Sequence, residues 1–359
     1  MLDKLPPEVC ALIFDFACRD GRTGLSLSHV SRYIRNTSEL ARYTSIVLSG
    51  PAQIIAFAQF AEHTRIKLKT RYLFINGQES EQELERMVHE AYAGTRKARI
   101  EYRNLARNRF LLPGDEKLRE AEEAVARECT NADILLGMEG ASAVESILRT
   151  VGPTLEVLDI SLNKYVAKML LNPMSLPCLV DLTTRCGFPL CPSGVPGLEP
   201  THSLRYLHIV DSARNWVCVE GFFRNGISYF APSLTYLRLS ELYEDEVVIK
   251  DLECALGHSE DSDFVTQLPP TLERVVIRPA VAPQHNCSPP CDVCVELQDY
   301  QDLVRFARRL HQKDARVKLM KANSIRVEGF QEWLDKNVKA VSGWDTSDLD
   351  LDSEEGETE

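Results

Sequence analysis

The chain has 359 residues, of which 44% are hydrophobic and 26% are charged, and its formal net charge is −12. This composition is typical of a globular protein, and the length favours two or three domains. Eight acidic residues and no Lys or Arg lie in 345–359, so removing those eight charges from −12 leaves −4 for residues 1–344. Nothing in that balance favours binding to a phosphate backbone, and we expect no nucleic acid partner.

Targeting signals are not visible in the sequence. No run approaches the roughly 18 apolar residues that a membrane span needs, and no basic segment leads into an apolar core with a cleavage site. We therefore expect no membrane partner and a cytoplasmic or nuclear location. The eleven cysteines are then interpreted as reduced thiols rather than as a disulfide framework.

The segment LPPEVCALIFDFA, residues 5–17, predicts a first helix. Pro6 and Pro7 suit a helix start, where backbone N–H groups have no intrahelical partner. Its apolar positions form two stripes at helical spacing, Val9, Leu12, Ile13 and Phe16 on one side and Cys10, Phe14 and Ala17 on the other. A helix that is apolar on two sides must be covered on two sides.

A turn at residues 20–24 and a second helical stretch follow, with apolar positions at Leu27, Val30 and Ile34. A unit of about 40 residues cannot bury enough surface to be stable by itself. Either the rest of the chain or a separate partner must cover it.

These two segments together resemble an F-box in the divergent form of basidiomycete-type fungal proteins. The matching positions are Leu5, Pro6, Glu8, Val9, Ile13, Phe14, Leu25, Leu27, Val30, Ser31, Arg32 and Arg42. The family often has Cys where Ser31 stands and Trp where Tyr33 or Tyr43 stands. The resemblance implies an F-box-like helical module over residues 1–50 that docks on the Skp-type adaptor, and through it the cullin, of an SCF-type ubiquitin ligase. The implied adaptor-binding residues are Leu5, Pro6, Val9, Ile13, Phe14, Leu27, Val30 and Arg32.

Residues 51–152 predict a linker strand and a helical spacer. We expect a strand at 69–77 and helices at 53–60, 79–108, 116–136 and 141–150. The breaks fall at a Pro-Gly-Asp sequence at 113–115 and at a Gly-Pro pair at 152–153.

A frame of apolar-x-x-apolar-x-apolar recurs from residue 155 onward. It is formed by Leu155, Leu158, Ile160; Leu204, Leu207, Ile209; Leu234, Leu237, Leu239; and Leu272, Val275, Ile277, with a degraded copy at Leu179 and Leu182. Successive copies start 24, 25, 30 and 38 residues apart. The pattern resembles leucine-rich repeats, which stack into a solenoid. The alternative is a set of unrelated short strands in a mixed α/β domain.

The predicted fold class is therefore mixed α+β or α/β. A small N-terminal F-box-like module precedes an irregular leucine-rich-repeat-like domain at 153–343. Helices at 297–311 and 327–341 and a strand at 316–319 are expected to cap its end. The acidic tail at 344–359 has almost nothing to bury and is expected to be disordered.

Residues that alternate with the apolar frame are expected to line an exposed sheet face. Tyr and Arg are frequent anchors of protein interfaces. The predicted target-binding residues are Tyr206, His208, Tyr236, Arg238 and Arg274. The alternative is a solvated face without a partner.

A Cys-rich segment offers a candidate zinc site at His285, Cys287, Cys291 and Cys294. The ligands of structural zinc sites usually come from two separated segments, so we favour a loop of reduced thiols and predict no metal and no cofactor. The basic positions Arg96, Lys97, Arg99, Arg103, Arg107 and Arg109 are interpreted as a solvated helix face.

The sequence contains no Gly-rich phosphate loop, no Gly-x-Ser-x-Gly elbow and no His-Glu-x-x-His motif, so we expect no enzymatic activity. By the resemblance, the expected function is that of a non-catalytic substrate-recognition subunit of an SCF-type ubiquitin ligase. The target protein is not predicted. The alternative is an interaction scaffold with no role in ubiquitination.

Overall fold

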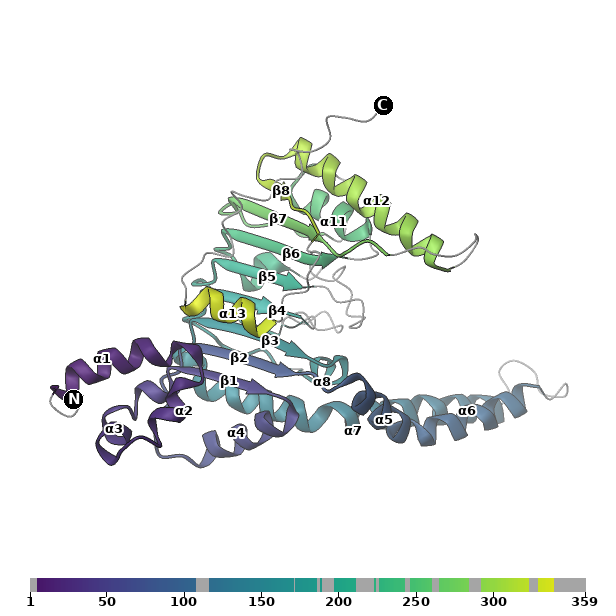
Figure 1. Cartoon of the computed structure of the whole chain (residues 1–359). Coiled ribbons are helices and arrows are strands. Elements are labelled where there is room, and N and C mark those ends of the chain that lie inside the picture. Colours follow the sequence, from purple (N-terminus) through teal and green to yellow (C-terminus); the bar gives the residue numbers. More distant parts are fainter. Residues whose placement is uncertain are drawn as a thin grey trace.

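A computed structural model describes residues 5–107, 116–170, 172–185, 188, 197–210, 223, 226–242, 246–259, 265–283, 292–322 and 329–338. Within this part of the chain, strands form one parallel sheet in which each strand lies beside its neighbours in the sequence (Figure 1). The strands are β1 Ser45–Ser49, β2 Tyr72–Gly77, β3 Val157–Leu162, β4 Asp181–Thr184, β5 Tyr206–Val210, β6 Tyr236–Leu242, β7 Arg274–Pro279 and β8 Val317–Leu319. The predicted mixed α/β class is confirmed.

Helices cover the face of the sheet that we call the inner face. They are α4 Pro51–His63, α7 Glu116–Val151, α8 Lys164–Met169, α10 Ile227–Phe230, α11 Glu246–Ala255 and α12 Asp292–Lys313. The side chains of the predicted apolar frame point from the sheet toward these helices. Its leucines, its isoleucines and Val275 are buried in one continuous core with residues of α4, α7, α11 and α12. This core also includes β1 and β2, which lie N-terminal to the predicted repeats.

The predicted helical spacer differs from the structure in two places. The expected helix at 79–108 is two helices, α5 Glu81–Ala91 and α6 Ala93–Ala106. The expected helices at 116–136 and 141–150 are one helix, α7, of 36 residues. Helices α6 and α7 run side by side away from the sheet (Figure 1).

Two glycines at the expected break in α7 have a packing role instead. A Cβ at Gly137 would overlap the carbonyl oxygen of Tyr165, and one at Gly140 would lie 2.8 Å from Cγ2 of Val166. The two glycines therefore let α8 approach the backbone of α7 closely. The prediction of a break in the helix was wrong, because glycine is favoured both where a helix ends and where another element packs closely against a helix.

The N-terminal module consists of short helices with a core of their own. Its helices are α1 Pro7–Ala17, η2 Cys18–Asp20, α2 Thr23–Leu27, α3 Arg32–Thr37 and η3 Ala41–Tyr43. The small core contains Cys10, Phe14, Cys18, Ile34 and Ala41. Ser31 starts α3, because its hydroxyl accepts a hydrogen bond from the backbone N–H of Ile34 at 3.2 Å.

The C-terminal elements confirm only part of the predicted cap. Helix α12 and β8 lie at the end of the sheet, as expected (Figure 1). Helix α13, Gly329–Val338, does not: it returns across the opposite, outer face of the sheet (Figure 1). It does so because its apolar residues pack on β2 and η2 and not on the last strand.

None of the helices described is long and apolar enough to cross a membrane. Among the described residues, Cys10, Cys18, Cys129, Cys178 and Cys254 form no disulfide.

Gly137→Ala tests the close approach of α7 and α8. Alanine normally stabilises a helix interior relative to glycine by up to about 1 kcal/mol, whereas overpacking costs about 1–3 kcal/mol. We expect a net loss in the free energy of unfolding of about 1 kcal/mol or more, measured by urea denaturation. Gly94→Ala is the control, because its Cβ meets only the mobile carboxylate end of Glu128. Equal stabilisation by both substitutions would contradict the packing role.

Candidate functional site

A single row of side chains crosses the outer face of the sheet from β1 to β8. The parallel register places one residue of each strand in this outer row: Val47, Phe74, Asp159, Thr183, His208, Arg238, Val276 and Lys318. Its first two members are apolar and its middle is polar or charged. Alternation along each strand explains why this row faces away from the apolar core.

The apolar beginning of the outer row is covered by the aromatic residues of α13. The ring centroid of Phe74 lies 5.6 Å from that of Phe330 and 5.8 Å from that of Trp333. The guanidinium of Arg22, in the N-terminal module, lies 4.2 Å from the centroid of the Phe330 ring. Helix α13 therefore contacts both the sheet and the module.

Gly21 makes this close contact between the module and α13 possible. It adopts φ = 67°, which glycine tolerates without a steric penalty. A Cβ at this position would overlap the side chain of Val47 and lie 3.3 Å from the ring of Trp333. The residue thus fits only without a side chain.

The polar middle of the outer row is bound by Glu332 of α13. Its carboxylate lies 3.3 Å from a terminal nitrogen of Arg185 and 3.3 Å from one of Arg238. It also lies 3.7 Å from Nδ1 of His208. One carboxylate from a distant part of the chain therefore contacts residues that follow or belong to β4, β5 and β6.

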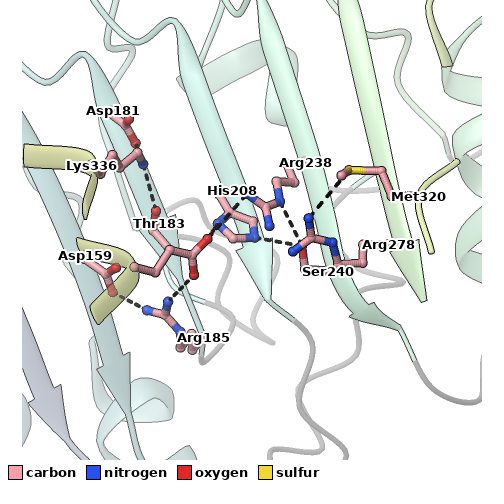
Figure 2. A network of polar contacts seen from close by, with 11 residues as sticks. Asp159, Asp181, Thr183, Arg185, His208, Arg238, Ser240, Arg278, Met320 and Lys336 are labelled. Carbon is pink, nitrogen blue, oxygen red and sulfur yellow. Dashed lines mark hydrogen bonds and ion pairs between the residues drawn. The ribbon is translucent and has the colours of Figure 1, made fainter. Parts of the chain in front are cut away.

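Two further ion pairs lie beside this carboxylate, one between α13 and β4 and one between the residue that follows β4 and β3. Lys336 Nζ donates to a carboxylate oxygen of Asp181 at 2.6 Å and to the hydroxyl of Thr183 at 3.3 Å. Arg185 pairs with Asp159, which is buried (Figure 2). The buried carboxylate of Asp159 is thus paired with a guanidinium, as burial of charge requires.

Ser240 connects His208 and Arg238 on the sheet itself. Its hydroxyl lies 2.9 Å from Nε2 of His208 and accepts from Nε of Arg238 at 3.1 Å (Figure 2). Arg278, in register with Ser240, donates to the sulfur of Met320 at 3.7 Å (Figure 2). We refer to Arg185, Arg238 and Arg278 as the arginine cluster.

Burial shifts the pKa values of these groups. It lowers the pKa of Arg238 to about 10 and also lowers that of Arg278. Burial, followed by the charges of Arg238 and Arg185, lowers the pKa of His208 well below its ordinary value, so the imidazole is neutral. Burial raises the pKa of Asp159 to about 6, against the opposing effect of Arg185. Lys336 and Arg278 also act to lower the pKa of His208.

The predicted target-binding residues lie on one face of three adjacent strands, in two rows. Tyr206, Tyr236 and Arg274 are neighbours in register and half-buried, and the two tyrosine rings stack with centroids 5.0 Å apart. His208 and Arg238 belong to the outer row and are only 2% and 7% exposed. The expectation of an exposed face was wrong for these two, because α13 places Glu332 against them.

The predicted adaptor-binding residues divide into exposed and internal positions. Pro6, Val9, Ile13, Val30 and Arg32 are exposed. Phe14 is buried in the small core of the module, and Leu5 and Leu27 pack against that core while half-buried. Phe14 therefore contacts its own module and is not presented at the surface, because its side of α1 faces α3 and η3.

Two other sequence predictions concern the candidate zinc ligands and the basic helix face. The candidate zinc ligands His285, Cys287, Cys291 and Cys294 lie outside the part of the chain whose side chains the structure describes. The basic residues of α6, Arg96, Lys97, Arg99, Arg103 and Arg107, are exposed as predicted, and Arg109 also lies outside the described residues.

Sequence reasoning did not identify Arg185, Glu332 and Lys336 as site residues. Glu332 and Lys336 are four residues apart on α13 and so share a helix face, and this spacing is the signal that was available. It indicates a charged helix face but does not identify the residues that face contacts, because those residues lie more than 90 positions earlier in the chain.

A scan against protein-family models, a search of curated proteins and a search of solved structures each found no match to this chain.

His208→Asn tests the neutral buried imidazole. Since the folded pKa of His208 is depressed, the unfolded chain binds a proton below about pH 6.5 that the folded chain does not, and stability falls as the pH falls. Between about pH 7.5 and 5.5 this costs the wild type about 1.4 kcal/mol, and the variant does not show that loss. Urea denaturation at the two pH values gives the difference.

The raised pKa of Asp159 acts with the opposite sign, because its contribution to stability grows as the pH falls through about 6. That contribution is common to both proteins and cancels in the comparison. Parallel pH profiles of wild type and variant would show that His208 is not buried as a neutral group.

Proposed function

We propose that this protein is a non-catalytic substrate-recognition subunit of an SCF-type ubiquitin ligase. Its N-terminal module would bind a Skp-type adaptor as an F-box does, and its parallel sheet would bind the target protein. The transfer chemistry would belong to other subunits. Holding both partners raises the effective concentration of target lysines near the ubiquitin-charged enzyme.

The uncovered side of α1 is the observation that carries this proposal. The stripe of Cys10 and Phe14 faces the small core, but the other stripe is exposed, with Leu12 74% and Phe16 65% accessible. Val9, Ile13, Leu25 and Val30 are also exposed on the module. The described chain covers one apolar side of α1 and leaves the other open, as expected for a helix that docks on a separate subunit.

The order of the strands supports the proposed irregular leucine-rich-repeat-like solenoid. In a solenoid each unit contacts only its neighbours, and here every strand pairs with the strands next to it in sequence. The buried leucines and isoleucines of the recurring frame lie in register across β3 to β7. The unequal gaps fit repeats with insertions of different length.

The contacts of α13 support a fixed relation between the two proposed binding regions. Ser45 donates a hydrogen bond to the carbonyl of Arg19 at 3.0 Å, and Thr44 donates to Asp15 at 3.1 Å. With the contacts of Arg22 and Gly21 to α13, these bonds hold the module against the sheet. A receptor needs this rigidity to present its target at a constant position relative to the ligase.

The double variant Leu12→Lys/Phe16→Lys tests adaptor binding. Both side chains are exposed, so we expect the fold to be retained, while binding to a purified Skp-type adaptor weakens at least about tenfold because buried apolar contacts are replaced by charge. Isothermal titration calorimetry measures the affinity.

Leu135→Lys on α7 is the matched control, because Leu135 is also 74% exposed but lies away from the module. If the wild-type protein does not bind the adaptor, the proposed function is wrong. Capture of the adaptor without cullin from cell extracts would instead support a scaffold with no ligase role.

Tyr206→Ala/Tyr236→Ala tests target binding. The stacked, half-buried rings lie beside Arg274 at the start of β5 to β7 and offer aromatic contact area to a partner. We expect the target proteins that co-purify with wild type to decrease at least about tenfold in quantitative mass spectrometry, while the adaptor is still captured. Tyr229→Ala, at an exposed tyrosine on α10, is the control. Unchanged target capture would contradict the assignment.

A further inference from the structure

We propose that the arginine cluster on the outer face is a binding site for an acidic peptide segment, and that Glu332 occupies this site as an internal stand-in for the acidic side chain. The inference deepens the proposed function, on which it rests for the identification of the acidic segment as part of a target protein. The presence of the site itself follows from the geometry of this chain.

The cluster is built from three separate parts of the sheet, and two of its arginines contact one carboxylate. Arg185 follows β4, Arg238 lies on β6 and Arg278 lies on β7. The first two contact Glu332 at 3.3 Å each. Guanidinium groups bind carboxylates through charge-assisted hydrogen bonds, so two of them on one carboxylate, with Arg278 beside them in register with Ser240, form a site for anionic side chains.

Glu332 does not use the full donor capacity of the cluster. Nε of Arg278 is buried without a hydrogen-bond acceptor among the described residues, and another of its nitrogens has only a thioether sulfur, a weak acceptor, at 3.7 Å. A buried donor of a charged group without an acceptor is costly. A segment with more than one carboxylate would satisfy donors that Glu332 leaves unbonded.

The surroundings of the cluster favour a carboxylate over any cation. His208 lies between Arg238 and the neighbouring strand β4 and is neutral because of its burial and the adjacent positive charges. Lys336 adds another cation nearby, although it is paired with Asp181. Asp159 and Glu332 contact Arg185, and the charge of Glu241 also acts to raise the pKa of Arg185 and Arg278.

Glu332 is also the most accessible member of the contact. Its side chain is 30% exposed, compared with 14% for Arg185 and 8% for Arg238. Glu332 is therefore the member of the contact that an incoming group meets first. An incoming carboxylate thus replaces Glu332 first, without requiring the sheet to open.

A peptide fits these observations better than a nucleic acid. The group that occupies the site is a carboxylate of a peptide, and the arginines surround one point instead of tracking a backbone. Residues 1–344 carry a net charge of −4, the remainder after the eight acidic residues of 345–359 are removed from −12, so long-range attraction for a polyanion is lacking.

The test measures binding of a fluorescein-labelled peptide with three consecutive glutamates between neutral flanks, by fluorescence anisotropy, to the purified full-length chain without adaptor. We expect wild type to bind this peptide and not its glutamine counterpart. Glu332→Gln, which removes the competing charge, should tighten binding about tenfold. Arg278→Gln should weaken it at least about tenfold in both backgrounds.

Matched controls separate the site from general charge effects. Asp335→Asn makes the same charge change on α13 as Glu332→Gln and should leave the affinity unchanged. Arg309→Gln, at an exposed arginine on α12, should also leave it unchanged. Thermal unfolding of each variant checks that it is folded. If Glu332→Gln is unstable, the peptide affinities of wild type and Arg278→Gln still test the site.

The inference is overturned if wild type and Glu332→Gln both fail to bind the acidic peptide, if the glutamine peptide binds equally, or if a single-stranded RNA oligonucleotide binds more tightly than the peptide. Because the adaptor is absent from the assay, the result is independent of adaptor binding. If the wild-type protein binds the adaptor but not the acidic peptide, the proposed peptide site is wrong and the proposed function is retained. If it binds the acidic peptide but not the adaptor, the peptide site is retained and the proposed ligase role is wrong.

Discussion

The pairing of Glu332 with residues of the outer row is the interaction on which the arrangement of this molecule depends. A parallel sheet is normally covered on both faces, and here the inner face has a continuous apolar core whereas the middle of the outer face is charged. Arg185 and Arg238 could not be buried without a carboxylate, since an unpaired buried charge is strongly unfavourable. Helix α13 supplies that carboxylate, so its position is set by electrostatics in the middle of the sheet and by aromatic packing at the β2 end.

This dual attachment makes α13 a connection between the N-terminal module and the sheet. Phe330 contacts Arg22 on one side and Phe74 on the other, and Trp333 lies against Gly21. Any change that releases Glu332 acts on a helix whose other contacts are to the module. Helix α13, of ten residues, therefore contacts both the outer face and the module, although it lies about 300 residues after α1 in the sequence.

The elements of this fold that could be predicted from sequence are those encoded by local periodicity. The frame around Leu158, Leu207 and Leu237 gave the strands and their buried sides correctly, because a period of two reports which face is apolar. The position of α13 could not be predicted this way. Its stripe of Phe330 and Trp333 shows that one side is buried, but periodicity carries no information about the surface that buries it.

The same limit explains the errors at the candidate site. His208 and Arg238 were placed on the correct face of the sheet, but their burial depends on a helix more than 90 residues later in the chain. Phe14 was assigned to the adaptor-binding residues because the F-box resemblance implies it. Both stripes of α1 are apolar, and only the packing of Ile34 and Ala41 decides which stripe is internal. The periodicity of apolar residues thus identifies the faces of each helix and strand, and tertiary contacts decide which of these faces remain accessible to a partner.

The two proposed binding surfaces differ in their chemistry, and the difference has a functional consequence. The open stripe of α1 is apolar, with Leu12 and Phe16 most exposed, so binding there depends on burial of surface and responds little to ionic strength. The arginine cluster acts through charge, and the approach of a charged partner slows as the ionic strength rises. A receptor with this division would retain its adaptor while targets bind and leave, as repeated cycles of recognition require. Helix α13, in contact with both regions, is the element through which occupancy of one surface could alter the other.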